Sequence, residues 1–244
     1  ICALHTYSMI HPEADLYAHD IHFTGKSSSF KVTYEGKDYD FETRLAGRFN
    51  VYNTLGAVGA CLSEGVPMET IVEGMRDFKS VPGRFELIDE GQPFTVVVDY
   101  AHTPDGLEKI LTTAEEITKG RIIVVFGCGG DRDRMKRPIM GRIAARNADI
   151  ALVTSDNPRT EDPASIVKEV AAGVEEVKKE KPSLSYEVIV DRRSAICRAI
   201  ELAKPGDIVL IAGKGHENYQ ILKDKTIHFD DREEARKALK LKEK

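Results

Sequence analysis

Four short polar stretches of this sequence could do chemistry, and the clearest of them reads DNPRTEDP from Asp156 onward. Asp156 and Asn157 offer carboxylate and amide groups, while Arg159 offers a planar guanidinium that can hold a carboxylate through two parallel hydrogen bonds. The stretch also fits a turn, because Asn-Pro often starts turns and Thr160 or Asp162 can cap a following helix. From these residues alone, a ligand site and a strand-to-helix turn are equally good interpretations.

A second stretch, GCGGDRDRMKRP over residues 127–138, combines glycines with cations. The glycines allow another backbone to approach closely, and a glycine-rich turn before a helix favours an anion. The cations are Arg132, Arg134, Lys136 and Arg137. The spacing fits neither a dinucleotide-binding GxGxxG pattern nor a Walker phosphate loop. An anion site is therefore predicted here, over the alternative of a flexible basic loop exposed to solvent.

A third stretch, DYAHTPD, begins at Asp99. A carboxylate at a strand end can accept hydrogen bonds from both hydroxyls of a ribose, and His102 could contact a phosphate. On composition alone the favoured interpretation is a turn, in which Asp99 ties down the loop and Thr103 or Asp105 caps the next helix.

The fourth stretch, GKGHE, runs from Gly213 to Glu217. Its glycines open the loop, and the Glu217 carboxylate could hold an ammonium group. A glycine turn with a surface glutamate explains the same residues equally well. The spacing is not that of a P-loop, so the stretch cannot cradle phosphates in that way.

All four stretches follow apolar runs of strand length. The five runs in this part of the chain are TVVVDY (95–100), RIIVVFG (121–127), DIALVTS (149–155), YEVIV (186–190) and DIVLIAG (207–213). The helical patterns between them cover residues 105–118, 137–147, 163–179 and 192–203. Strands this apolar are buried on both faces, and their alternation with helices predicts a parallel sheet with right-handed crossovers. We therefore expect an α/β, Rossmann-like domain whose ligands bind at the carboxyl ends of the strands.

The earlier part of the chain has a different pattern. Apolar and polar residues alternate, which predicts antiparallel strands near 20–24, 29–34 and 38–43, with turns at Gly25-Lys26 and Glu35-Gly36. Helices are expected over residues 50–63 and 68–78, and a hairpin with a closing helix is expected at the carboxyl terminus. Val81-Pro82-Gly83 interrupts the pattern, so the predicted domains are residues 1–82 and 83–244.

The strand-end residues would share one rim of the sheet. They are Arg132, Asp156, Asn157, Arg159 and Glu217. Guanidinium groups hold carboxylates and carboxylates hold ammonium groups, so this rim suits a zwitterionic amino acid. Two arginines and two acids suit a diamino-diacid better than a simple amino acid.

Composition argues against several other classes. The chain has 244 residues, a net charge of −5 and 41% hydrophobic residues, which is enough for one large or two smaller cores and gives no basic surface for nucleic acid. No apolar run approaches the ~20 residues that span a membrane, and the amino terminus lacks the features of a signal peptide. The widely spaced cysteines indicate reduced thiols of a cytoplasmic protein, without a disulfide frame or zinc site: Cys2, Cys61, Cys128 and Cys197.

Four motifs, in this order and spacing, closely resemble the carboxyl-terminal half of MurE-type Mur ligases: VVVDYAHTPDGLEKIL, VFGCGGDRDRMKRPIMG, TSDNPRTEDP and IAGKGHENYQ. LAGRFNVYNTLGA and VPGRFELI resemble the stretch that precedes them in that family. The resemblance covers nearly the whole chain from about residue 20. It implies that residues 1–82 are the last part of a central ATP-binding domain and that residues 83–244 are a Rossmann-like domain that binds the incoming amino acid.

The resemblance also implies roles for individual residues. DNPR resembles the motif that recognises meso-diaminopimelate, and an arginine at position 159 favours this amino acid over lysine. The implied amino-acid-binding residues are Arg132, Asp156, Asn157, Pro158, Arg159, Gly213 and Glu217. The implied nucleotide-binding residues are Asn50 and Asn53 on the adenine side, Arg84 and Asp99 near the ribose, and His102 in the same pocket.

The implied reaction is ATP-dependent addition of meso-diaminopimelate to UDP-MurNAc-L-Ala-D-Glu in peptidoglycan synthesis, with Mg²⁺ as a cofactor of the intact enzyme. The family's phosphate loop, a GTNGKT-like sequence, does not occur in these 244 residues, and the first residue is Ile1. We therefore expect part of a longer ligase, with no complete catalytic set and no metal site, that is inactive alone. A monomer is expected, with small-molecule partners and neither nucleic acid nor membrane.

Two alternatives stay open. One is a Mur ligase that adds lysine or another amino acid, against which Arg159 argues. The other is a non-catalytic module that binds a diamino acid.

Overall fold

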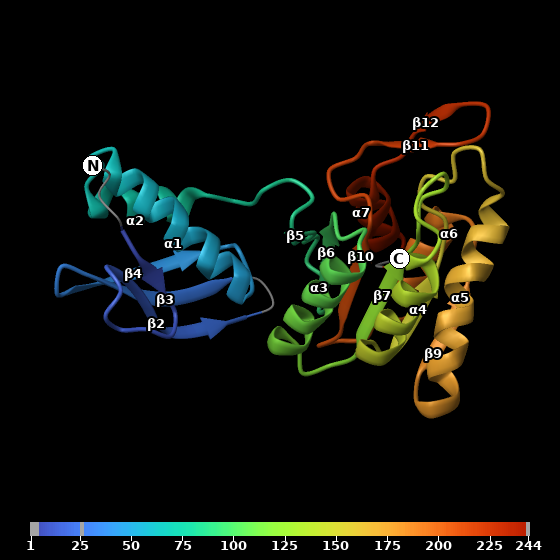
Figure 1. The fold of residues 1–244 in the computed structure, drawn as a ribbon, viewed down its shortest axis with the longest axis horizontal. Coiled ribbons are helices and arrows are strands. Elements are labelled where there is room, and N and C mark those ends of the chain that lie inside the picture. The colour runs from blue at the N-terminus through green and yellow to red at the C-terminus, as the bar shows by residue number, and fades with distance from the viewer. Residues whose placement is uncertain (1–4, 25–26, 243–244) are drawn as a thin grey trace. The chain divides into compact units, whose positions relative to one another are not determined.

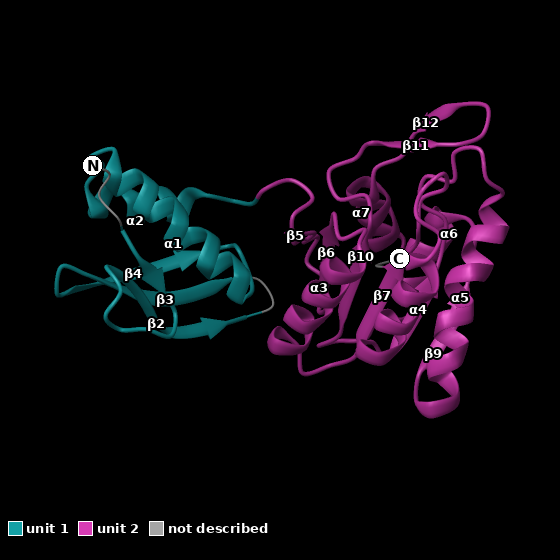
Figure 2. Cartoon of the chain, viewed as in Figure 1, with its two compact units in different colours: residues 1–80 teal, residues 81–244 magenta. Residues whose placement is uncertain are grey.

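The computed structural model describes residues 5–24 and 27–242. The chain divides into two compact units, residues 1–80 and 81–244 (Figure 1, Figure 2), so the division falls two residues before the predicted boundary. The turn predicted at Gly25-Lys26 and the cysteine at position 2 lie outside the described residues. No helix in the described part of the chain is long and apolar enough to cross a membrane.

Unit 1 packs a four-stranded sheet against two helices, α1 (Arg48–Ser63) and α2 (Met68–Asp77). β1 (Tyr7–Ser8) pairs in parallel with β2 (Leu16–Phe23), and β2, β3 (Ser28–Tyr34) and β4 (Lys37–Thr43) pair antiparallel in sequence order. This confirms the predicted antiparallel strands, although β2 begins earlier than expected. Alternate strand residues face the helices and form the core of the unit with Val51, Leu55 and Val58 of α1.

Unit 2 contains a six-stranded sheet in the order β5-β6-β10-β7-β8-β9. The strands are β5 (Glu86–Leu87), β6 (Thr95–Asp99), β7 (Ile122–Phe126), β8 (Ile150–Val153), β9 (Ser185–Val188) and β10 (Ile208–Ala212). Strands β6 to β10 pair in parallel, and the short edge strand β5 pairs antiparallel with β6. The predicted apolar runs are thus confirmed as the parallel strands of a Rossmann-like α/β domain.

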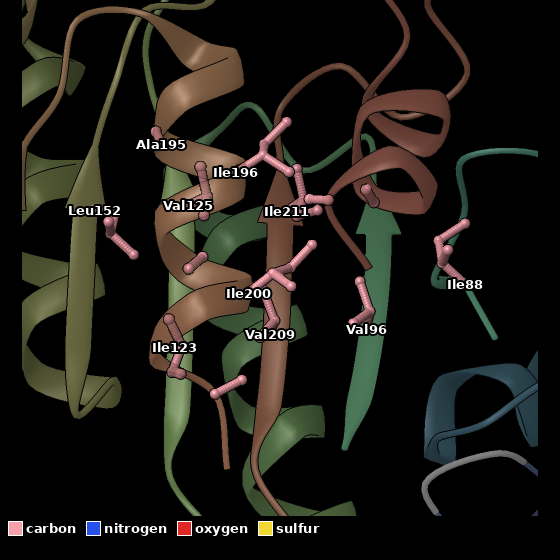
Figure 3. Close-up of a cluster of buried hydrophobic side chains, with 14 of the residues drawn as sticks. Ile88, Val96, Ile123, Val125, Leu152, Ala195, Ile196, Ile200, Val209 and Ile211 are labelled. Carbon is pink, nitrogen blue, oxygen red and sulfur yellow. The ribbon is translucent and has the colours of Figure 1, made fainter. Parts of the chain in front are cut away.

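Helices cover both faces of this sheet (Figure 1). α3 (Pro104–Ile117), α4 (Lys136–Asn147) and α5 (Pro163–Glu180) lie side by side on one face, and α6 (Arg192–Leu202) and α7 (Asp231–Lys242) cover the other. Figure 3 shows Ile196 of α6 next to Ile211, and Ile200 of α6 next to Val209, in the cluster that buries this face of the sheet. Burial on both faces fixes the central strands, and therefore the points where their loops begin.

The position of β10 between β6 and β7 decides which loops are neighbours. The GKGHE loop that follows β10 lies between the loops that follow β6 and β7, at the edge where ligands bind in such sheets. The predicted hairpin comes next, as β11 (Tyr219–Ile221) and β12 (Thr226–His228), and α7 is the predicted closing helix.

Candidate functional site

The carboxyl edge of the unit 2 sheet gathers buried polar side chains from two predicted motifs. Asp156 and Asn157 follow β8 and are only 8% and 4% exposed. Asn157 Oδ1 accepts hydrogen bonds from Lys214 Nζ (3.1 Å) and from the backbone N of Ile221 (3.0 Å). Asn157 Nδ2 donates to Glu217 Oε2 (2.9 Å). The DNPR and GKGHE stretches therefore meet in one hydrogen-bonded cluster.

Lys214 lies at the centre of this cluster. Its side chain is fully buried, and its ammonium lies 3.2 Å from Glu217 Oε2 and 3.6 Å from Asp156 Oδ1. Two carboxylates beside one ammonium reduce the cost of burying that charge. Asp156 Oδ1 is buried and makes no hydrogen bond within the described residues, so its contact with Lys214 is a charge interaction alone.

Arg159 is held in an uncommon backbone conformation. Its φ of 52° lies in the left-handed region, which costs a non-glycine residue about 1–2 kcal/mol. Its N–H donates to Ile221 O (3.1 Å), and its Nη1 donates to Gly130 O (2.9 Å) and Asn157 O (3.4 Å). Across residues 5–24 and 27–242, Nη2 and Nε have no hydrogen-bond partner, which leaves half of the guanidinium for a ligand carboxylate.

Arg132 approaches the same place from the neighbouring loop. Gly129 lies next to both side chains. A Cβ atom added to Gly129 would lie 2.8 Å from Arg159 Nη1 and 3.8 Å from Arg132 Cγ. The Arg132 side chain is exposed, and its Nη1 donates to Asp131 O (3.2 Å). Neither Arg132 nor Arg159 forms an ion pair with any described residue. The stem of Arg132 thus lies close to the Arg159 guanidinium, on the solvent side of the Asn157 cluster.

Arg137 fastens the glycine-rich loop to the DNPRTEDP stretch. Its side chain is fully buried and donates to both carboxylate oxygens of Glu161 (2.7 and 2.9 Å) and to Glu169 Oε2 (2.9 Å). The Arg137 guanidinium lowers the pKa of Glu161 to about 2. The Gly130 N–H donates to Asn157 O (2.9 Å), which is a second link between the loops. The two loops therefore form one structural unit.

The other cations of the glycine-rich stretch also contact the protein. Arg134 pairs with Glu169, and Lys136 Nζ donates to the backbone carbonyl of His102 (2.9 Å). Of the four cations predicted to attract an anion, three therefore already have structural partners. Among these four cations only Arg132 stays available for the predicted anion, and Arg159 of the neighbouring stretch could bind the anion with it.

The glycines of this stretch are explained by contact with the protein's own backbone. A Cβ atom on Gly127 would lie 2.2 Å from Thr154 O, and one on Gly130 would lie 1.9 Å from Pro158 O. Both distances are clashes, so these positions require glycine. Pro158 has a packing role here, and its contact with a ligand stays a prediction.

Helix caps lie within the same motifs. Thr103 caps α3, and Asp162 caps α5 by accepting a hydrogen bond from Ser165 N (3.0 Å). Thr160 instead donates to Asp131 Oδ1 (2.7 Å). DNPRTEDP is therefore both a capped turn and a part of the polar cluster, because its first residues face the cluster and its last residues begin the helix.

A buried ion pair, which was not predicted, lies beside Gly213. Arg192 and Asp231 begin α6 and α7, both are fully buried, and Arg192 Nε and Nη2 each donate to Asp231 at 2.7 Å. A Cβ atom on Gly213 would lie 3.8 Å from Arg192 Nη2 and 3.9 Å from Asp156 Oδ2. The Gly213 φ of 124° is also a glycine conformation. Gly213 thus lets the chain turn tightly beside the cluster.

Asp99, which was predicted to lie near a ribose, is bonded to the backbone. Its Oδ2 accepts from Phe85 N and its Oδ1 accepts from Ala101 N, both at 2.7 Å. Burial raises the pKa of Asp99 above its ordinary value, and these two hydrogen bonds oppose the shift. The geometry supports the alternative in which Asp99 ties down the loop. A contact with ribose stays a prediction.

Arg84 and His102 both contact the ring of Tyr100, a residue that was not predicted to belong to the site. The Arg84 guanidinium lies 4.7 Å from the centre of the Tyr100 ring, and the rings of His102 and His216 lie 4.6 and 5.2 Å from it. Cation–π and ring contacts of this kind hold exposed side chains in place. Two of the predicted nucleotide-binding residues therefore lie next to the GKGHE loop.

The two predicted asparagines belong to unit 1. Asn50 is buried on α1, and its Nδ2 donates to Ala46 O (2.9 Å). Asn53 is exposed and its Nδ2 points to Asn50 Oδ1 (3.4 Å). Asn53 therefore presents its amide to solvent, whereas Asn50 anchors the start of the helix. Contact of either residue with adenine stays a prediction.

No group of three or more His, Cys, Asp or Glu side chains suited to a metal ion occurs in the part of the chain that the structure describes. The described cysteines, Cys61, Cys128 and Cys197, are free thiols. Burial raises the pKa of Cys128 to about 12, so this thiol stays protonated at neutral pH.

Comparison with known protein families shows matches to two domains. Residues 83–215 match the glutamate ligase domain of Mur ligases, and residues 1–61 match the Mur ligase middle domain. The chain belongs to the Mur ligase family.

Two curated Mur ligases are similar to this one over most of its length. They are UDP-N-acetylmuramoyl-L-alanyl-D-glutamate–2,6-diaminopimelate ligases from Clostridium botulinum and Geobacillus kaustophilus, each 49% identical, over 95% and 96% of this chain. The chain spans about half the length of these relatives, 47% of each.

Two solved Mur ligase structures have the same fold. A UDP-N-acetylmuramoyl-L-alanyl-D-glutamate–2,6-diaminopimelate ligase is 38% identical with a TM-score of 0.75, covering 98% of this chain and 48% of that one. A MurF ligase from Thermotoga maritima, in complex with ADP, is 13% identical with a TM-score of 0.62, covering 97% and 48%, and supports the fold alone.

In this Mur ligase chain, contacts link four of the seven residues predicted to bind the amino acid, Asp156, Asn157, Arg159 and Glu217, and they add Lys214 as a buried member. Pro158 and Gly213 adjoin these residues in the chain or in space, and Arg132 bonds only to Asp131. One signal could have found Lys214, namely a lysine flanked by two glycines directly after a fully apolar strand. The nucleotide set is divided, because Asn50 and Asn53 lie in unit 1 whereas Arg84, Asp99 and His102 lie in unit 2.

Proposed function

We propose that this chain binds the incoming amino acid in an ATP-dependent ligase that adds meso-diaminopimelate to UDP-MurNAc-L-Ala-D-Glu. The observation that carries the proposal is the pair of guanidiniums, Arg159 and Arg132, beside the acidic cluster of Asp156 and Glu217. Such a site suits a ligand with both carboxylates and ammonium groups. Relatives that are 49% identical over almost the whole chain bear the name of this activity.

Arg159 is the group best prepared to select the amino acid. Its Nη1 is anchored on Gly130 O, so Nη2 and Nε would hold one carboxylate of diaminopimelate as a planar fork. Arg132 would contact the same carboxylate from the neighbouring loop. The carboxylates of Asp156 and Glu217, whose side chains keep 11% and 16% of their surface exposed, would receive the ammonium group next to that carboxylate. Lysine lacks the second carboxylate and would leave Arg159 unpaired.

The site's contribution to the reaction is orientation. In the proposed ligation ATP phosphorylates the γ-carboxylate of the D-glutamyl residue, the second amine of diaminopimelate attacks the acyl phosphate, and an amide forms as phosphate leaves. Holding the amine in line with the acyl carbon is worth several orders of magnitude of effective molarity. Magnesium would neutralise phosphate charge in such a reaction. The described residues provide no cluster for it, so the steps given to this site do not involve the metal.

Nucleotide-binding roles are also proposed for residues within each unit, taken by itself. Arg84 and His102, collected on Tyr100, would contact the ribose and phosphates, with Asp99 supporting their loop. Asn53 offers an exposed amide on the adenine side, and Asn50 supports it.

Calorimetry with the 244-residue chain tests the proposal directly. Titration with meso-diaminopimelate should give saturable binding at least about 100-fold tighter than L-lysine, because a site built for a charged group rejects a ligand that lacks it. Adding the amino-terminal half of the Clostridium botulinum relative, with ATP, Mg²⁺ and UDP-MurNAc-L-Ala-D-Glu, should then yield amide product. Equal or better use of lysine would indicate a lysine-adding ligase. Tight binding without ligation would indicate a non-catalytic module.

A further inference from the structure

We propose that Lys214 is a positioning residue of the amino-acid site, whose buried ammonium sets the geometry of Asn157, Asp156 and Glu217. The inference rests on the proposed function and deepens it. Lys214 is predicted to act through these three side chains, without touching the amino acid. It would thus decide how tightly diaminopimelate binds and how well the site distinguishes it from lysine.

The burial of Lys214 is the first observation. Its side chain is fully buried, whereas the side chains of Asp156 and Glu217 keep 11% and 16% of their surface exposed. The ammonium therefore lies behind the carboxylates as seen from solvent. A buried ammonium is costly unless charged and polar partners surround it, and all of its ion-pair and hydrogen-bond partners in the described residues are predicted site residues.

The orientation of the Asn157 amide is the second observation. Its Oδ1 accepts two hydrogen bonds, from Lys214 Nζ (3.1 Å) and Ile221 N (3.0 Å). Two donors on one side fix which end of the amide carries oxygen, so Nδ2 must point to Glu217 Oε2 (2.9 Å). Without the Lys214 donor, the amide loses one of the two bonds that prevent its rotation.

The connection to Arg159 is the third observation. Ile221 donates to Asn157 and accepts from Arg159 N (3.1 Å), so the strand β11 bridges the two residues. Arg159 Nη1 in turn reaches Asn157 O (3.4 Å). The left-handed backbone of Arg159 persists only because its neighbours hold it. Loosening Asn157 should therefore loosen Arg159 as well.

Electrostatics gives Lys214 a second effect. Asp156 and Glu217 lie on either side of its ammonium, at 3.6 and 3.2 Å. Two carboxylates that converge on one place repel each other, and the ammonium between them offsets this repulsion and holds them close. A ligand ammonium would then meet a prepared pair of carboxylates.

The test compares Lys214→Met with a matched lysine at the other edge of the sheet. Lys181, like Lys214, has three polar partners, since its ammonium donates to the carbonyls of Ala145, Arg146 and Ala148. Lys181→Met should lower thermal stability without changing affinity for diaminopimelate. Lys214→Met should weaken diaminopimelate binding about 10- to 100-fold, the range found when a group that orients a ligand-holding side chain is removed.

Two further readouts separate positioning from general damage. In the ligation assay, Lys214→Met should raise KM for diaminopimelate far more than it lowers kcat, and it should reduce the preference over lysine. Lys214→Gln, whose amide can still donate to Asn157, should recover part of the affinity, and it also serves if Lys214→Met does not fold. Near-ultraviolet circular dichroism and thermal melts verify the fold of each variant.

The outcomes are distinguishable. If the unmodified chain neither binds nor helps to ligate diaminopimelate, the proposed function fails, and this inference fails with it. If the unmodified chain binds and folded Lys214→Met and Lys214→Gln bind equally well, only the role of Lys214 is wrong. A loss of stability like that of Lys181→Met, with unchanged affinity, would also overturn it.

Discussion

The two edges of the unit 2 sheet use polar side chains in different ways. At the amino edge these side chains bond mainly to backbone groups. The buried Asp207 accepts from the N–H groups of Arg121 (2.9 Å) and Lys204 (2.8 Å) and also pairs with the Arg121 guanidinium (2.6 Å), and the exposed Asp149 accepts from Ile122 N (2.8 Å). Each such bond satisfies a strand or helix end that would otherwise be unpaired. The polar groups of this edge are explained by the fold.

At the carboxyl edge, polar side chains bond mainly to one another. Lys214, Asn157 and Glu217 form a closed set of contacts, Asp156 Oδ1 faces the Lys214 ammonium, and part of the Arg159 guanidinium has no partner in the described structure. A fold needs no such arrangement, because replacing mutually bonded polar groups by apolar ones of equal volume is often neutral for stability. The difference teaches that the partner of a buried polar group, more than its burial, separates a structural role from a binding role.

The strongest test of the carboxyl edge concerns the buried pair Arg192–Asp231. Arg192→Met should lower the free energy of unfolding by about 3–5 kcal/mol, because it leaves the Asp231 carboxylate buried and unpaired. Urea denaturation measures the loss. The double variant Arg192→Met with Asp231→Leu should recover most of it. A single substitution that costs less than about 1 kcal/mol would mean that backbone N–H donors, as at the amino edge, satisfy the Asp231 carboxylate.

Arg159 tests binding without a comparable effect on stability. Arg159→Ala should weaken diaminopimelate binding by about 2–4 kcal/mol, as for loss of a buried charge-assisted contact. Arg159→Lys should also bind poorly, because a point charge cannot replace a planar fork. Calorimetry gives both values, with Arg142→Ala on the outer face of α4 as the control, since Arg142 pairs only with Glu176 in the described residues. Unchanged affinity for Arg159→Ala would remove this residue from the site.

Asp207 tests the amino edge. Asp207→Ala leaves two backbone N–H groups and the Arg121 guanidinium without their acceptor, so unfolding should become easier by about 1–3 kcal/mol. Affinity for diaminopimelate should stay the same, since the edge lies at the opposite ends of the strands. A drop in affinity equal to that of Arg159→Ala would show that the two edges are not independent. The division into a structural edge and a binding edge would then be wrong.

Much of this organisation could be predicted from the sequence. The five apolar runs predicted the parallel strands, because burial on both faces leaves a strong compositional signal. Asp162, which caps α5, was also among the expected caps. The insertion of β10 between β6 and β7 could not be predicted, because strand order depends on which helix covers which face. That order is what brings Lys214 to Asn157.

The polar partners were harder to predict than the strands. Arg137 and Arg134 have the same charge and lie three residues apart, yet one is fully buried and the other is exposed. Helical rotation and the position of Glu161 and Glu169 decide this difference, and neither can be read from composition. The four cations are equivalent in the sequence, whereas the structure pairs Arg134 and Arg137 with carboxylates and bonds Lys136 to a backbone carbonyl. Arg132 alone has no side-chain or distant backbone partner among the described residues.

The smallest predicted effect concerns the link between the two loops of the site. Arg137 lowers the pKa of Glu161 from its ordinary value of 4.5 to about 2. Because the folded-state pKa is the lower one, this pair stabilises the fold fully above about pH 4.5, and the stabilisation is lost as pH falls towards 2. At pH 7, Glu161→Gln should cost about 1–2 kcal/mol, after allowance for solvent screening of a partly exposed side chain.

Urea unfolding between pH 7 and pH 2.5 tests this sign. The stability difference between the unmodified chain and Glu161→Gln should shrink steadily below pH 4.5, because protonation removes the same charge that the substitution removes. Glu176→Gln, on an exposed pair with Arg142, should show almost no difference at any of these pH values. A difference that persists undiminished at pH 2.5 would mean that Glu161 acts through hydrogen bonds that glutamine cannot make. The loops of the carboxyl edge would then be joined by geometry and not by charge, as the amino edge is.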